Sequence, residues 1–236
     1  MLQKLALLSK EDFQEGQILL LNKEMGWTSF DVVKKIKNLL KEKFNIKKIK
    51  VGHAGTLDPL ATGLLIVCTG KFTKIISSIQ NQEKTYTGEI TLGATTPSYD
   101  LETDINKTFD TSKITNESIQ KTSLQFIGEI EQKPPVFSAL KIKGERLYKK
   151  ARRGEDVVID SRKITVFSFD IKEYELPKFK FKIKCSKGTY IRSIAHDFGE
   201  RLKNGGYLSK LCRTNIGKYN ISDSITINDF TNQLNT

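Results

Sequence analysis

The sequence places an aspartate in a glycine-punctuated loop, within the stretch GHAGTLDPLATGLLIVCTG at residues 52–70. Asp58 precedes Pro59, and a proline disfavours the helical conformation for the residue before it, so we expect the carboxylate on a stiffened, extended loop. A carboxylate held in this way can act as a nucleophile or as an electrostatic stabiliser. An Asp-Pro pair alone is usually a simple turn, so the dipeptide leaves both readings open.

Three further side chains have types and positions that could do chemistry. Arg192 falls in the first turn of an expected helix, where the positive end of the macrodipole makes a cation mildly unfavourable, and such local exceptions gather at functional sites. Tyr86 lies on the apolar face of an expected strand, so its hydroxyl needs a partner. His53 has no neighbour at metal-ligand spacing. Taken singly, a solvated arginine, a core tyrosine and a structural histidine remain the simpler readings.

The segment at 131–154, EQKPPVFSALKIKGERLYKKARRG, interleaves cations with Phe137 and Tyr148. Its cations are Lys133, Lys141, Lys143, Arg146, Lys149, Lys150, Arg152 and Arg153. Cations suit phosphates and rings suit stacked bases, so this pattern favours a nucleic-acid surface over a merely solvated helix face. The net charge of +12 agrees with a polyanionic partner but leaves a membrane-surface role open.

Several classes of protein are disfavoured. The chain contains no GxxxxGK[ST] or GxGxxG pattern, so a nucleotide cradle is not expected. The three cysteines, Cys68, Cys185 and Cys212, form no CxxC pair, and neither histidine belongs to an HExxH motif. We therefore expect no disulfide framework and no metal site, with the cysteines as small core residues. No apolar run reaches the roughly 18–20 residues of a membrane span, and no secretory signal is evident. A cytoplasmic protein is expected.

Two segments of the N-terminal half should position these residues. Residues 28–44 predict a helix with one apolar stripe, begun by a capping box of Thr28 and Asp31. The loop at 52–63 then leads into a short buried strand, LLIVC. Residues 84–93 alternate, with Tyr86 on the core face and a polar outer face.

The C-terminal half continues the strand pattern. KITVFSFDI at 163–171 and KFKFKIKCS at 178–186 predict strands, the second with alternate apolar and lysine residues. Thr189 is expected to cap a helix that the Gly205–Gly206 pair ends. Alternating strands predict a mostly antiparallel, mixed central sheet flanked by helices and loops, with helices covering one side. The fold class is therefore α+β, in a single domain of residues 1–236.

Together these signals resemble one family. GHAGTLDPLATGLL looks like the motif around the catalytic aspartate of TruB-type tRNA pseudouridine synthases, which implies that role for Asp58. CSKGTYIRSIAHDFG resembles the motif whose arginine pairs with that aspartate, which implies Arg192. KTYTGEITLG resembles the motif of the active-site tyrosine, so Tyr86 would stack on the uracil. LSKLCRTNIG resembles the late motif, so Leu211 would pack in the uracil pocket.

The resemblance runs from about Ile18 to Phe230 and carries further implications. His53 would help to fill the space left by the flipped base. The segment 131–154 resembles the family's RNA-clasping thumb insertion, with Lys141, Lys149, Lys150, Arg152 and Arg153 as expected RNA contacts. The pseudouridine-synthase-like fold and the activity follow by the same resemblance: isomerisation of uridine 55 in the T loop of tRNA by base flipping.

The expected partner is thus the T arm of tRNA, bound by a monomer without cofactor or metal. Two departures from the family pattern are visible: Glu24 stands where proline is usual, and the chain stops at Thr236, where many bacterial members continue into a small RNA-contact domain. A non-catalytic RNA-binding or tRNA-folding protein on the same scaffold remains the alternative, and an enzyme acting on rRNA is a third reading.

Overall fold

The computed structural model describes residues 7–138, 140–142, 144–155 and 157–235. The chain forms two compact units: unit 1 comprises Met1–Tyr86 and Leu211–Thr236, and unit 2 comprises Thr87–Lys210. Strands β4 (Lys84–Leu92) and β12 (Gly206–Ile216) each run from one unit into the other. The single-domain organisation expected from the sequence stays a prediction.

The sheet of unit 1 is centred on β3 (Thr62–Thr69), which is buried along nearly its whole length. Strands β1 (Ile18–Lys23) and β2 (Val51–His53) pair with β3 antiparallel, whereas β12 pairs with it in parallel. Strand β13 (Tyr219–Asn220) pairs antiparallel with β12. The mixed, mostly antiparallel sheet expected from the sequence is confirmed.

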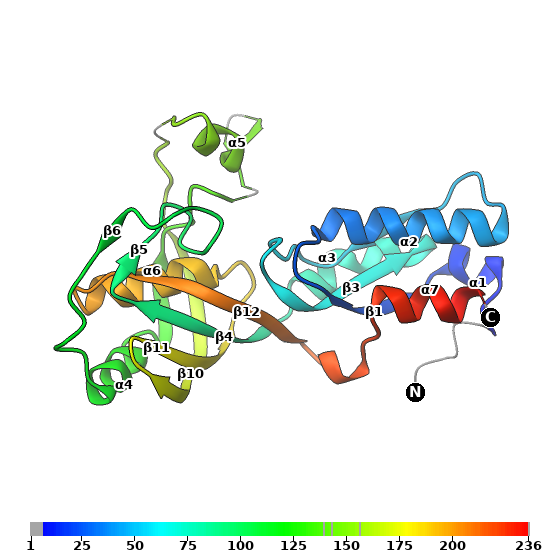
Figure 1. The fold of residues 1–236 in the computed structure, drawn as a ribbon. Coiled ribbons are helices and arrows are strands. Elements are labelled where there is room, and N and C mark those ends of the chain that lie inside the picture. The colour runs from blue at the N-terminus through cyan, green and yellow to red at the C-terminus, as the bar shows by residue number, and fades with distance from the viewer. Residues whose placement is uncertain (1–6, 139, 143, 156, 236) are drawn as a thin grey trace. The chain divides into compact units, whose positions relative to one another are not determined.

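Helices lie on both faces of the unit 1 sheet. Helices α2 (Ser29–Phe44) and α7 (Ile227–Asn235) bury their apolar stripes against Leu65 and Val67, while Leu64 and Ile66 pack on the opposite face near Ile79 of α3 (Figure 1). The expectation that helices cover one side is therefore wrong here, because β3 is apolar on both faces. The shorter elements of this unit are α1 (Lys10–Glu15), α3 (Ile76–Gln80), and the 3-10 helices η2 (Gly70–Ile75) and η3 (Ile221–Asp223).

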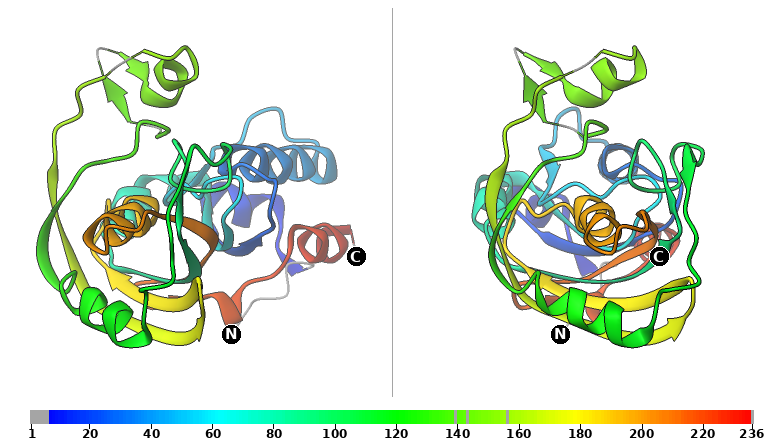
Figure 2. Two further views of the ribbon diagram at one scale, coloured as in Figure 1. Left: turned by 60° about the vertical axis from the view of Figure 1, so that its left-hand side comes forward. Right: turned by 90° about the vertical axis from the view of Figure 1, so that its left-hand side faces the viewer.

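In unit 2 the strand order is β12, β4, β11 (Lys178–Cys185), β10 (Arg162–Glu175) and β7 (Gly128–Gln132). Helix α6 (Ile191–Arg201) packs on these strands through Phe198, whose ring contacts those of Phe126, Phe169 and Phe179. Helix α4 (Asn116–Leu124) lies against β10 (Figure 2). Remaining short strands are β5 (Ala94–Thr95), β6 (Lys107–Thr108), β8 (Lys141–Ile142) and β9 (Glu145–Arg146).

Most expected elements are confirmed. Thr28 and Asp31 form the predicted capping box of α2, and β11 alternates buried apolar residues with outward lysines. The outer face of β4, by contrast, is not exposed at Glu89. This residue is buried, and its carboxylate accepts from Ser209 Oγ and Lys210 Nζ of β12 at 2.9 and 3.2 Å. Burial raises the pKa of the Glu89 carboxyl, but these two hydrogen bonds and the charges of Lys210 and Lys178 together lower it below its ordinary value.

Helix α6 differs from prediction at both ends. Its N-cap is Tyr190, without a side-chain cap, because the Thr189 hydroxyl instead donates to the Ser186 carbonyl at 3.0 Å and closes the preceding turn. The helix ends at Arg201, before the glycine pair. Cys68 and Cys185 are fully buried as expected, whereas Cys212 is half-buried.

Candidate active site

The loop that carries Asp58 connects β2 to β3 within unit 1. Asp58 is half-buried, and its carbonyl accepts a hydrogen bond from the Ala61 amide at 3.1 Å, which closes a turn over Pro59. On one side of the loop, Ser29 Oγ accepts from the Leu57 amide at 2.8 Å and donates to the Leu57 carbonyl at 3.1 Å. One buried hydroxyl at the start of α2 thus satisfies both backbone groups of the residue that precedes Asp58.

Lys23 holds the other side of the same loop. Its side chain is fully buried, and Nζ donates to the carbonyls of Trp27 at 2.7 Å, Glu24 at 3.0 Å and Pro59 at 3.4 Å. Burial lowers the pKa of the Lys23 ammonium to about 8; the negative charge of Asp58 opposes that lowering and the positive charge of Arg213 adds to it.

Arg213 is a second buried cation beside the loop. Its guanidinium donates to the carbonyls of Leu64 at 2.9 Å, Gly55 at 3.0 Å and Thr56 at 3.3 Å. The sequence interpretation missed both cations. The period-2 pattern of β1 could have found Lys23, which shares the core face with Leu19 and Leu21.

The other predicted residues of unit 1 lie on strands. His53 ends β2 rather than lying in a loop, and burial, followed by the charge of Arg213, lowers its pKa, so the ring is neutral at pH 7. Tyr86 is buried in β4, as predicted from its place on the apolar face. Leu211 is half-buried in β12, and its carbonyl accepts from Thr62 Oγ1 at 3.3 Å, which joins it to the start of β3.

Arg192 belongs to unit 2, in the first turn of α6, and its side chain is buried. Its Nη1 donates to the Ser98 carbonyl at 3.2 Å and its Nη2 to the Phe137 carbonyl at 3.0 Å. Asp100 Oδ2 lies 3.6 Å from Nε. The simple reading of a solvated arginine is therefore wrong: the guanidinium is held by two segments of unit 2, around Ser98 and Asp100 and at Phe137.

The basic segment 131–154 folds into the β8–β9 hairpin and α5 (Leu147–Arg152), at the end of two extended connections (Figures 1 and 2). Lys149 is exposed and Lys150 half-buried. Arg152 pairs with Glu102 at 2.8 Å, and Arg153 pairs with both Glu145 and Glu155 at 2.7 Å. Lys141 begins β8, and its side chain lies outside the described part of the structure.

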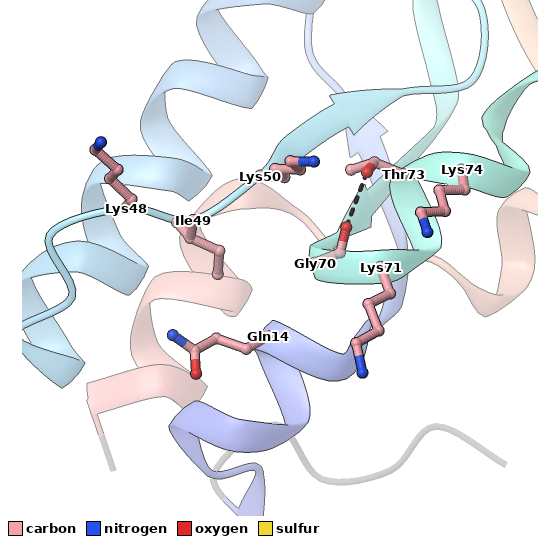
Figure 3. A pocket seen from close by; sticks show the side chains of 8 residues that line it. All are labelled: Gln14, Lys48, Ile49, Lys50, Gly70, Lys71, Thr73 and Lys74. Carbon is pink, nitrogen blue, oxygen red and sulfur yellow. Dashed lines mark hydrogen bonds between the residues drawn. The ribbon is translucent and has the colours of Figure 1, made fainter.

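A second cationic surface is a pocket of about 330 Å³ in unit 1 (Figure 3). It is lined by Gln14, Lys48, Ile49, Lys50, Gly70, Lys71, Thr73 and Lys74. Lys71 is paired with Glu15 at 2.8 Å. Figure 3 shows the lysines on two sides of the opening, from the approach to β2 and from η2.

Among the described residues, no group of three His, Cys, Asp or Glu side chains could hold a metal ion. No helix in the described ranges is long and apolar enough to cross a membrane.

Comparisons with known proteins show which family the chain is similar to. Residues 41–191 match the family model described as TruB family pseudouridylate synthase (N terminal domain). The chain is 54% identical to tRNA pseudouridine synthase B of Flavobacterium johnsoniae, over 96% of this chain and 100% of that protein. It is 48% identical to tRNA pseudouridine synthase B of Phocaeicola vulgatus, over 93% of each.

A solved structure extends the comparison to the fold. A chain of an H/ACA RNP bound to a substrate RNA containing 2'-deoxyuridine matches with a TM-score of 0.67 and 26% identity. The match covers 93% of this chain and 53% of that one, so this chain spans about half the length of that solved chain.

Proposed function

Because the chain belongs to the TruB family of pseudouridylate synthases, we propose that it isomerises uridine to pseudouridine at position 55 in the T loop of tRNA. The observation that carries the proposal is the Asp58 loop, whose flanking backbone is held by three buried side chains. A loop fixed in this way presents a carboxylate without further reorganisation, as catalysis requires.

The proposed reaction breaks the N1–C1′ glycosidic bond and forms a C5–C1′ bond. The proton on C5 is lost and N1 regains one, so no atoms are gained or lost overall and no external oxidant is required. Asp58 acts near C1′ or C6 of the target uridine, either as the nucleophile or as an electrostatic stabiliser of the detached sugar. Both routes need the ionised carboxylate.

We assign the remaining residues to supporting roles. Arg192 keeps Asp58 ionised and orients it, for which a buried, pre-oriented guanidinium is well suited. Tyr86 stacks on the uracil, and Leu211 packs against the detached base so that it rotates without escaping. His53, neutral at pH 7, helps to fill the space that the flipped base leaves.

The RNA contacts are assigned to the segment 131–154, through Lys141, Lys149, Lys150, Arg152 and Arg153. Its place at the end of two connections supports a clasping role on the T arm. With tRNA as substrate, we place the protein in the cytoplasm and propose that it acts as a monomer. A non-catalytic RNA-binding or tRNA-folding protein would share the charge and the segment, but would have no use for a fixed carboxylate.

The deciding experiment is incubation of the purified protein with an unmodified tRNA transcript, followed by mapping of pseudouridine at single-nucleotide resolution. We expect modification at position 55 and none in a transcript in which that uridine is replaced by cytidine. Tight binding without modification would favour the non-catalytic alternative. Modification of an rRNA fragment in preference to the tRNA would instead favour the third reading.

A further inference from the structure

Arg213 connects the Asp58 loop to the centre of the unit 1 sheet. It lies on β12 opposite Gly63 of β3, in the parallel pairing of these strands. A side chain at Gly63 would not fit, because its Cβ would lie 2.4 Å from the Arg213 carbonyl oxygen and 2.7 Å from its nitrogen. This close approach brings the guanidinium to Leu64 on the strand and to Gly55 and Thr56 on the loop.

The hydrogen-bond partners of Arg213 do not compensate well for the free-energy cost of burying its charge. The side chain is 1% exposed, and its three hydrogen bonds go to neutral backbone carbonyls rather than to a carboxylate. Burial of a cation with neutral partners costs free energy that an apolar side chain of the same size would avoid. Residues that break a local rule of packing tend to serve a site.

The loop geometry indicates which site is served. Thr56 lies two residues before Asp58, so a hydrogen bond that fixes the Thr56 carbonyl also fixes the position of the backbone that leads to Asp58. Ser29 and Lys23 hold the loop at Leu57 and Pro59, whereas Arg213 holds it at Gly55 and Thr56 and connects it to the rigid strand β3. A misplacement of about 1 Å at a reacting group costs on the order of 100-fold in rate.

We propose that Arg213 is a positioning residue for Asp58: it acts through the loop backbone, without itself touching the RNA. This inference rests on the proposed function. A merely structural arginine would affect folding and RNA affinity as well as rate, whereas a positioning residue affects the chemical step in a protein that folds and binds normally.

The test compares Arg213→Gln and Arg213→Lys with wild type in single-turnover pseudouridine formation, tRNA affinity and thermal unfolding. Arg213→Lys keeps the buried charge, so it can be assayed in place of Arg213→Gln if the glutamine variant does not fold. Arg201→Gln is the matched control, because Arg201 is exposed and its Nη1 also donates to a backbone carbonyl, that of Gln125 at 2.8 Å. Arg213→Ala is assayed with and without added guanidinium ion.

We expect both Arg213 variants to react roughly 10- to 100-fold more slowly at saturating enzyme, with tRNA affinity within about threefold of wild type and part of the rate restored to Arg213→Ala by guanidinium. A folded variant with a rate close to wild type would overturn the proposal. So would parallel losses of rate and affinity, or failure of both variants to fold, since each assigns Arg213 to the fold alone. An inactive wild type would instead overturn the proposed function.

Discussion

The Asp58 loop and the basic segment 131–154 both lie outside long regular elements, but their side chains are used in opposite ways. Around Asp58, buried Lys23 and Arg213 donate their hydrogen bonds to backbone carbonyls. In the basic segment, exposed Arg152 and Arg153 pair with glutamates of their own unit. The first arrangement fixes the backbone, whereas the second leaves cations at the surface.

The energetics of the two regions differ accordingly. Exposed ion pairs contribute about 0–1 kcal/mol and weaken with salt, so the segment can rearrange at little cost, although each paired glutamate competes with a phosphate for its arginine. A buried donor or acceptor that loses its partner costs about 1–3 kcal/mol, so the loop cannot rearrange as cheaply. This difference agrees with the proposal that the loop serves chemistry and the segment serves binding.

The sharpest separation of the two roles is expected at Asp58. Asp58→Asn keeps the size of the side chain and removes its charge, so pseudouridine formation should fall below detection, by at least about 10⁴-fold, while tRNA affinity changes little. Rate and affinity are measured on the same preparation, by single-turnover mapping and by filter binding.

The control for Asp58→Asn is Asp104→Asn, an exposed aspartate of unit 2 that is far from the loop in sequence. It should leave the rate unchanged. Activity that survives in Asp58→Asn would end the assignment of the catalytic residue.

The next largest effect on rate is expected at Arg192. A lysine offers a point charge and cannot reproduce the planar fork that contacts Ser98 and Phe137. A side chain without these contacts is no longer held in one place, and a misplacement of about 1 Å costs on the order of 100-fold in rate, so Arg192→Lys should lower the single-turnover rate by roughly 10- to 100-fold. A variant that reacts within a few-fold of wild type would show that the guanidinium does not orient Asp58.

Local pattern predicted the elements well and the contacts poorly. The capping box of α2 and the alternation of β11 involve neighbours in sequence, so the sequence alone predicts them. Arg213, by contrast, contacts carbonyls about 150 residues earlier in the chain, and no periodicity encodes that meeting. Thr189 shows the same limit on a small scale. As a helix cap its hydroxyl would accept from a backbone amide, but in the structure it donates to the Ser186 carbonyl and closes the preceding turn.

The buried ammonium of Lys23 should make the stability of the folded protein depend on pH. Its pKa is about 8 in the folded protein and 10.5 when exposed, so between these values the unfolded chain binds more protons and stability rises with pH. The gain is at most about 3 kcal/mol. In chemical denaturation from pH 7 to 10, wild type should therefore gain stability relative to Lys23→Met, in which the other titrations cancel.

Lys149→Met serves as the exposed control for Lys23→Met, since it makes the same substitution in the basic segment. A stability difference between wild type and Lys23→Met that stays constant over this range would mean that the carbonyls of Trp27, Glu24 and Pro59 fully replace water around the ammonium. Lys23 would then hold the loop as a permanent charge.

The smallest expected effect is on the salt dependence of tRNA binding, where the lysines of the basic segment are compared with its arginines. Each neutralised phosphate lowers the slope of log K against log salt by roughly 0.7–0.9, so replacing Lys149, Lys150, Arg152 and Arg153 by glutamine should weaken binding and flatten the slope together. Because Arg152 and Arg153 already pair with glutamates, the double lysine variant should flatten the slope more than the double arginine variant. Equal slopes in the two doubles would mean that the glutamates release their arginines completely on binding. An unchanged slope in the quadruple variant would make the segment a solvated surface, and the path of the RNA would then have to be sought along the lysines of residues 34–50, two of which line the pocket of unit 1.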